Sequence, residues 1–314
     1  MKRRRLIAAL CLLAAAAPGT FVRTPLPVET SGLLEVRAAV RETAAMLPEG
    51  LTVDGVWSID GAGRGFGGFS ALLWEGNGLL AFTDRGDRLS FDPPDTPGAR
   101  FAISRVTPHP DYRPGLLDIE SAVRDDAGNL WLGFENGHAV HRFDAAGTPT
   151  GFRSLDEEIS LLANAGIEAM VRLPDGTFAL FPEWRDAVYR FDGDPTDGAT
   201  FTAQDMTLPL PDYGVTDAAL LPDGRVLMLL RDVSYTIPPT FGSALAIGTL
   251  PDAGADEAFA PELLVQLDTV VPRENYEGLA IRLGDDGAIA IWIISDDNFS
   301  VFQRTLMVRL TYRP

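Results

Sequence analysis

Acidic side chains recur in this sequence of 314 residues at positions that a repeated pattern makes equivalent. In four segments an acidic residue is followed by small and apolar residues, and the successive acids are 48, 49 and 60 residues apart. These acids are Glu120, Glu168, Asp217 and Glu277. A fifth segment of the same pattern, 50 residues before the first acid, has Ser70 at this position. The repeat therefore predicts one polar side chain at the same point of every unit.

A second set of polar residues lies at the end of the apolar run that follows each of these segments. The set contains Asp84, Arg85, Glu135, Glu183, Arg231, Asp296 and Asp297. The start of one strand and the end of its antiparallel neighbour lie at the same edge of a sheet, so we expect the two sets to meet around one site. Several carboxylates so close together cannot all stay ionised without a compensating cation.

Carboxylate oxygens are the ligands that a hard cation such as Ca²⁺ prefers. The predicted metal ligands are Glu120, Glu168, Asp217, Glu277, Asp84, Glu135, Glu183, Asp296 and Asp297. A Ca²⁺ ion there would neutralise the charge of a substrate and activate a water molecule. If the substrate is a phosphate ester, Arg85 and Arg231 would hold its phosphate oxygens, and together with Glu168 they form the predicted catalytic set. The alternative is that each acid accepts hydrogen bonds from backbone N–H groups of the neighbouring unit and so fastens the units together.

Short strands joined by tight turns must position these side chains. The chain has 31 glycines and 23 prolines, which favours turns over long helices. Turn signals of the Asp-Gly type follow the acids at matching offsets, at 126–128, 175–176, 223–224 and 286–287. A unit of about 50 residues that holds four strands and no helix is typical of a β-propeller, an all-β fold in which sheets stack as blades around an axis.

The repeat predicts a single propeller of five blades. The last unit has only 37 residues after Glu277 and is short of one strand. A strand at 51–59 would complete it, so that the ring is closed by pairing between N-terminal and C-terminal strands. Six blades are the alternative, in which residues 33–41 and their surroundings form an extra blade. We expect one propeller domain over residues 20–314, and a monomer.

The N-terminus has the layout of a secretory signal peptide over residues 1–19. Four basic residues at 2–5 precede an apolar run from Leu6 to Ala17, and Ala17-Pro18-Gly19 offers small residues for cleavage. No second apolar run of spanning length follows, so we expect no integral membrane span after cleavage. The only cysteine, Cys11, would leave with the leader. The sequence therefore predicts a periplasmic or secreted protein without disulfides.

The charge balance restricts the partners. With 26 Lys and Arg against 44 Asp and Glu, the net charge is −18, and nucleic acid would be repelled. A Gly-x-Ser-x-Gly elbow of the triad hydrolases is absent from the sequence. Cations are the more natural partners of so acidic a chain.

Seven short motifs resemble the family called "esterase-like activity of phytase". They are 66–72, 83–86, 118–120, 166–170, 230–232, 275–279 and 295–299, in this order, and the resemblance covers roughly residues 50–312. The family is similar to propeller phytases, which are secreted, calcium-dependent phosphomonoesterases. The resemblance implies the same fold and a metal-dependent hydrolase of phosphomonoesters or other esters. Two further hypotheses stay open: a non-catalytic propeller that binds a ligand or a protein at the same face, and a regucalcin-like lactonase.

Overall fold

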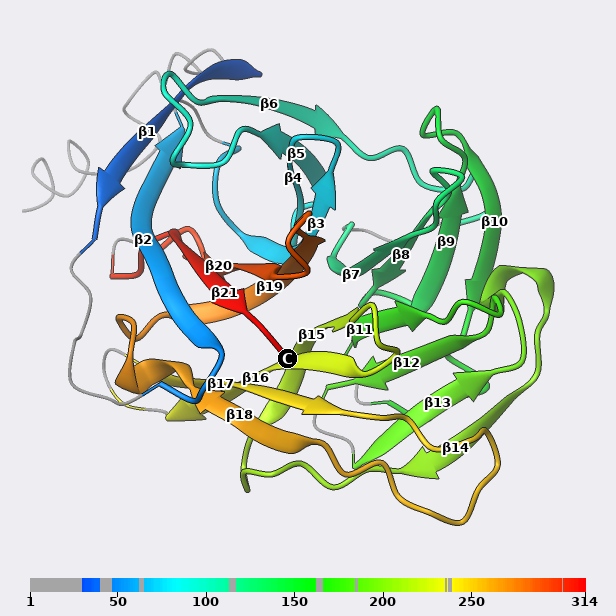
Figure 1. Cartoon of the computed structure of the whole chain (residues 1–314). Helices are drawn as coiled ribbons and strands as arrows, with labels where there is room; N and C mark the ends of the chain where they lie inside the picture. The colour runs from blue at the N-terminus through cyan, green and yellow to red at the C-terminus, as the bar shows by residue number, and fades with distance from the viewer. Residues whose placement is uncertain are drawn as a thin grey trace, which may run out of the picture.

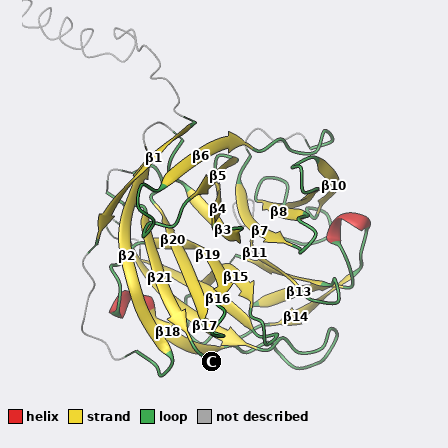
Figure 2. Ribbon diagram, turned by 45° about the horizontal axis from the view of Figure 1, so that its top comes forward, coloured by secondary structure: helices red, strands yellow, loops and turns green. Residues whose placement is uncertain are grey.

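Strands form nearly all of the regular structure of this protein. The computed structural model describes residues 30–39, 47–61, 65–112, 117–161, 166–183, 186–234, 236, 239–300 and 302–314. The predicted leader, residues 1–19, lies outside this part. Two single-turn 3₁₀ helices, η2 (Pro195–Asp197) and η3 (Leu267–Thr269), are the helical elements of the described residues (Figure 2). In that part of the chain no helix has the length and apolar character needed to cross a bilayer.

The strands pair as antiparallel arrays of four that follow the repeat of the sequence. The first array contains β3 (Phe69–Glu75), β4 (Gly78–Thr83), β5 (Asp87–Phe91) and β6 (Arg100–Arg105). The second contains β7 (Ile119–Arg124), β8 (Leu130–Phe134), β9 (Ala139–Phe143) and β10 (Pro149–Ser154). The third contains β11 (Ile167–Arg172), β12 (Phe178–Pro182), β13 (Ala187–Phe191) and β14 (Phe201–Asp205). The fourth contains β15 (Gly214–Leu220), β16 (Val226–Ser234), β17 (Thr240–Gly248) and β18 (Glu262–Gln266).

The fifth array joins the two ends of the chain. It contains β19 (Asn275–Leu283), β20 (Ile289–Asp296), β21 (Leu306–Tyr312) and the N-terminal strand β2 (Leu51–Gly61). Antiparallel pairing of β2 with β21, for example Val53 opposite Leu310, closes the ring as the sequence predicts. Strand β1 (Ser31–Ala38) pairs with β2 on one side and with β6 on the other, so the fifth and first arrays form one nine-stranded sheet. β1 is thus a bridge, and among the described residues no sixth four-stranded array accompanies it.

The first strands of the arrays surround the centre of the molecule. β3, β7, β11, β15 and β19 contact one another in a closed circuit, while β6, β10, β14 and β18 lie at the periphery (Figure 1). This arrangement confirms the all-β propeller predicted from the repeat. The turn glycines also behave as predicted, since Gly176 (φ 91°) and Gly224 (φ 86°) adopt the left-handed conformation that the tight hairpins require.

Apolar packing between neighbouring arrays holds the ring together. All five residues of β8 are buried, and the same is true of β12. One apolar cluster contains Phe82 of the first array and Leu132 of the second, and another contains Phe181 of the third and Met228 of the fourth. Both faces of β8 and of β12 are therefore covered by adjacent arrays. The packed ring fixes the first strands, and with them the polar residues at their starts.

Candidate functional site

A β-bulge lies near the start of every first strand. In β7 the pairing register shifts between Ile119 and Ser121, which leaves Glu120 as the extra residue. The corresponding extra residues in the other four first strands are Ser70, Glu168, Thr216 and Glu277. A bulge turns a side chain away from the alternation of the strand. Five consecutive first strands thus use the same local distortion at the same point.

A cavity of about 610 Å³ lies where the first strands begin and the second strands end. Among the described residues, its wall contains eight carboxyl groups and one guanidinium, that of Arg231. The carboxyl groups are those of Asp84, Asp118, Glu120, Glu135, Glu168, Glu183, Glu277 and Asp296. Most of the predicted site residues therefore converge on one mouth of the central channel.

Arg231 connects three polar residues of this wall. Its Nη2 donates to Oε1 of Glu183 at 3.2 Å, and its Nη1 donates to Oδ1 of Asn275 at 2.9 Å and to Oε1 of Glu277. The side chains of Arg231, Glu183 and Glu277 are each 15% exposed or less. Burial alone would lower the pKa of Arg231, but the surrounding carboxylates raise it. The guanidinium is thus held charged and in a fixed position.

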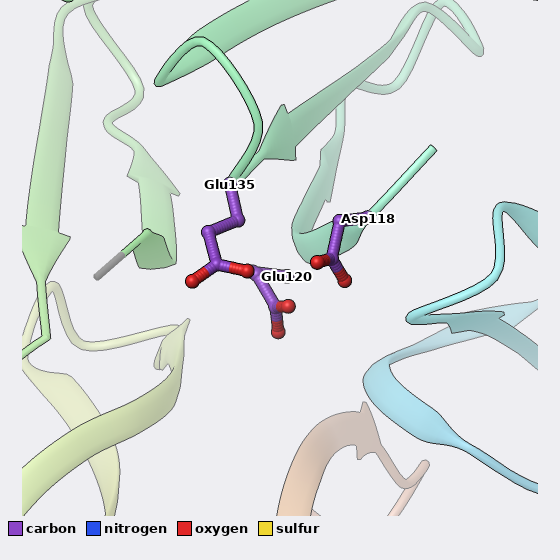
Figure 3. Close-up of side chains that lie close together, drawn as sticks. All are labelled: Asp118, Glu120 and Glu135. Atoms are coloured by element: carbon purple, nitrogen blue, oxygen red, sulfur yellow. The ribbon is translucent and has the colours of Figure 1, made fainter. Parts of the chain in front are cut away.

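Asp118, Glu120 and Glu135 form a compact carboxylate cluster from one array. One carboxylate oxygen of each lies within 4.8 Å of the others, and Figure 3 shows the three groups pointing into the same space. Ca²⁺–oxygen distances are about 2.3–2.6 Å, so two oxygens on one ion lie at most about 5 Å apart. A Cβ atom at the neighbouring Gly166 would lie 3.1 Å from Cγ of Glu120, so the glycine leaves room for this cluster.

Burial raises the pKa of several carboxyl groups in the cavity. The pKa of Glu135 is raised to about 8 by burial and by its hydrogen bond with Asp118. That of Asp296 is raised to about 9 by burial and by the charge of Glu277. Burial and the nearby Glu168 hold the pKa of Glu120 well above its usual range. A group of carboxyls that resists ionisation in this way is the environment that a divalent cation stabilises.

Asp84 differs from its neighbours. Its pKa is raised only to about 6, by burial and by the charge of Asp118, so it is mostly ionised at neutral pH. Its Oδ1 is buried and has no hydrogen-bond partner in the described part of the chain. A buried carboxylate oxygen without a donor is uncommon, because desolvation without a hydrogen bond costs free energy. Together with the all-oxygen donor set, this atom fits a site for a hard cation or for a substrate hydroxyl or water.

The structure does not place Asp217 in this wall, although the sequence pattern aligned it with Glu120. The bulge in β15 falls on Thr216, one residue earlier, and a shift of one residue turns a strand side chain to the other face. Asp217 is 2% exposed, and it accepts hydrogen bonds from the backbone N–H groups of Leu279 at 2.7 Å and Ala218 at 2.8 Å. Asp217 therefore fastens the fourth array to the fifth through a backbone hydrogen bond, as the alternative interpretation of the acids expects. We call this contact the latch.

Asp297 and Arg85 also lie outside the cavity wall. The carboxylate of Asp297 accepts hydrogen bonds from the N–H groups of Gly68 at 3.2 Å and Phe299 at 3.0 Å, so it fastens a loop to the first array. The Arg85 guanidinium stacks on the ring of Phe299, 3.3 Å from its centroid. Sequence spacing put both residues beside the correct strand ends, but contacts with distant segments, of Asp297 with Gly68 and of Arg85 with Phe299, turn their side chains elsewhere.

Several lining residues were not selected from the sequence. Asp118 and Asn275 each precede a bulged acid by two residues, and this i, i+2 spacing at a strand start could have indicated them. Val233, Pro239 and Phe241 line the wall beside Arg231, and no chemical motif marks them.

One described protein family matches most of this chain. A family model described as "Phytase-like: Esterase-like activity of phytase" matches residues 64–299. A comparison with curated protein sequences gives no match. Among solved structures, the PQQ-bound aldose sugar dehydrogenase of Streptomyces coelicolor is 14% identical with a TM-score of 0.47, over 84% of this chain and 100% of that one. Virginiamycin B lyase of Staphylococcus aureus is 12% identical with a TM-score of 0.41, over 89% and 100%.

Proposed function

Since this chain belongs to the phytase-like family described as esterase-like activity of phytase, we propose that its axial cavity hydrolyses small-molecule esters with the help of a bound Ca²⁺ ion. The observation that carries this proposal is the gathering of eight carboxyl groups and one arginine around one cavity of about 610 Å³. When ionised, so many acids at the innermost edge of a ring repel one another and destabilise the fold unless a bound cation offsets their charge. Phosphomonoesters and carboxylic esters both fall within the proposed activity.

Asp118, Glu120 and Glu135 would hold the ion, because their oxygens have the spacing and the chemistry that Ca²⁺ requires. When bound, the ion would offset the charge of the substrate and make a water molecule more acidic.

The remaining wall residues supply the proton transfers. Asp84 is mostly ionised at neutral pH and has one oxygen without a hydrogen-bond partner among the described residues, so it can accept a proton from the attacking water. The water oxygen forms the new bond to phosphorus or to the acyl carbon, and the bond to the leaving oxygen breaks. Asp296, whose pKa burial and the charge of Glu277 raise, can hold a proton and deliver it to that leaving oxygen. Arg231, fixed by Glu183 and Glu277, faces the negative charge that develops on the ester oxygens.

A screen of phosphate and carboxylic esters with and without Ca²⁺ tests this proposal. We expect hydrolysis that requires Ca²⁺ and that Glu120→Gln abolishes. Glu262→Gln is the matched control, because Glu262 is an exposed acid at the start of the outer strand β18. Saturable Ca²⁺ binding without hydrolysis of any ester would favour the non-catalytic alternative, and hydrolysis restricted to lactones would favour the lactonase alternative.

We also propose that the protein is exported after removal of residues 1–19. Support comes from the order of basic, apolar and small residues in that segment. Mass spectrometry of the exported fraction should find a mature chain that starts near residue 20, and a chain that retains Met1 would contradict this.

A further inference from the structure

The fourth array differs from the others at the mouth of the cavity. Its second and third strands, β16 and β17, have nine residues each, whereas the corresponding strands of the first three arrays have five or six. The first strand β15 stops pairing with β16 at Arg231, opposite Gly214. Beyond that point Asp232, Val233 and Ser234 pair with β17 alone. A two-stranded ribbon therefore continues past the start of the inner strand.

This ribbon carries an apolar pair next to the arginine of the site. Val233 is two residues after Arg231, so the two side chains lie on the same face of β16. Phe241 is the direct cross-strand partner of Val233, and both residues are only half-buried. All three line the cavity, together with the exposed Pro239. A wall that is otherwise lined by carboxyl and neutral polar groups thus has one apolar side, immediately beside the guanidinium.

The charges of the cavity disfavour a highly anionic substrate. Among the described residues of the wall, the eight carboxyl groups are opposed by one arginine, and that arginine already forms ion pairs with Glu183 and Glu277. Arg85, the other cation predicted for this mouth, stacks on Phe299 instead. Even with one divalent cation bound, the wall offers little positive charge for a ligand with many phosphate groups.

From these observations we infer that the substrate is a small ester of low charge with an apolar group beside the reacting bond, and that Phe241 and Val233 bind this apolar group. The inference rests on the proposed function and specifies its substrate class. The half-buried phenylalanine ring and valine methyl groups lose contact with water when such a group covers them. A hydrophilic polyanion would leave these apolar side chains in contact with water. Phe241 is accordingly a specificity-determining residue rather than a catalytic one.

Binding of unreactive ligands tests the inference independently of catalysis. Phenylphosphonate and methylphosphonate share the oxyanion and differ in the apolar group, and both can be titrated calorimetrically in the presence of Ca²⁺. We expect wild type to bind phenylphosphonate about tenfold more tightly or better, as is usual for an apolar group in a fitted pocket. Phe241→Ala should remove this difference, and Phe241→Leu should retain part of it. Equal binding of the two ligands by wild type would overturn the inference.

A matched control comes from the same array. Leu263 of β18 is 41% exposed on the outer strand and lies outside the cavity wall. Leu263→Ala should therefore keep the preference for phenylphosphonate. If Leu263→Ala and Phe241→Ala reduce the preference equally, the effect is not local and the inference is wrong.

Kinetics then separate the inference from the proposed function. We expect kcat/KM to rise from p-nitrophenyl acetate to p-nitrophenyl butyrate in wild type, with a smaller rise in Phe241→Ala, and little activity on inositol hexakisphosphate. Hydrolysis that is fastest on inositol hexakisphosphate and unaffected by Phe241→Ala would overturn the inference but support the proposed function. Phe241-dependent binding of phenylphosphonate without hydrolysis of any ester would support the inference and contradict the proposed function.

Discussion

Arg231 of β16 forms an ion pair with Glu277 of β19, in which Nη1 of the arginine donates to Oε1 of the glutamate. The pair crosses from the fourth array to the fifth, and Glu183 of the third array binds the same guanidinium. One buried arginine thus connects three arrays at the mouth of the channel. The arginine lies at the point where β16 stops pairing with the first strand β15, at the edge where the arrays converge.

Removal of this arginine should destabilise the fold. In Arg231→Gln the carboxylates of Glu183 and Glu277 stay buried without a counter-charge, which typically costs about 3–5 kcal/mol. Arg225→Gln in the same array is the control, because Arg225 forms a more exposed pair with Asp223 whose contribution should be about 0–1 kcal/mol. Urea unfolding of both variants measures the difference, and equal losses would contradict the role given to Arg231.

The latch at Asp217 and the site at Glu120 should respond differently to substitution. Asp217→Ala leaves the N–H of Leu279 without its acceptor and should cost roughly 1–3 kcal/mol of unfolding free energy. Because Asp217 lies outside the cavity wall, Ca²⁺ affinity should stay unchanged. Glu120→Gln should weaken Ca²⁺ binding instead. Urea unfolding and calorimetry on each variant check this, and a loss of Ca²⁺ affinity in Asp217→Ala would show that the assignment is wrong.

Without cations, stability should fall as the pH rises above about 4. In the folded protein Asp296 keeps its proton up to about pH 9, whereas in the unfolded chain it ionises near its ordinary value of 3.8. Between these values the unfolded state binds fewer protons than the folded state, so the free energy of unfolding decreases with pH. Asp296→Asn cannot ionise and should flatten the curve. Thermal melts in chelator from pH 5 to 9 test this, and melting temperatures that rise with pH would contradict it.

Closure of the ring should depend on two N-terminal strands to different degrees. A chain that starts at residue 47 lacks β1 and loses pairing along one edge of β2 and of β6. A chain that starts at residue 62 also lacks β2 and leaves β21 unpaired on one side. We expect the melting temperature to drop in the first variant and to drop much further in the second. If the chain starting at residue 62 melted like the full chain, closure through β2 would be refuted.

The sequence predicted the ring and most of the cavity wall because both depend on the repeat. Acids at Glu120, Glu168 and Glu277 begin first strands, and their partners at Glu135, Glu183 and Asp296 end second strands, so antiparallel pairing alone brings them together. The bulges were not visible in the sequence. In β15 the bulge falls on Thr216, and this single residue moves Asp217 from the cavity to the latch.

Tertiary contacts explain the other differences between the predicted site residues and the residues that line the cavity. Asp297 accepts a hydrogen bond from Gly68, and Arg85 stacks on Phe299. In each case the partner belongs to a distant segment of the chain. The apolar pair of Val233 and Phe241 reaches the cavity because β16 and β17 continue beyond β15. Strand length and loop packing of this kind arise from tertiary structure, which the periodicity of one sequence does not encode.

Calorimetric titration with Ca²⁺ is the most direct test of the central claim that the axial carboxylates hold a cation. For wild type we predict saturable heat of binding, with an affinity that falls about tenfold or more in Glu120→Gln and stays unchanged in Glu262→Gln. The absence of binding heat in wild type would contradict the cation site, and with it the proposed Ca²⁺-dependent hydrolysis.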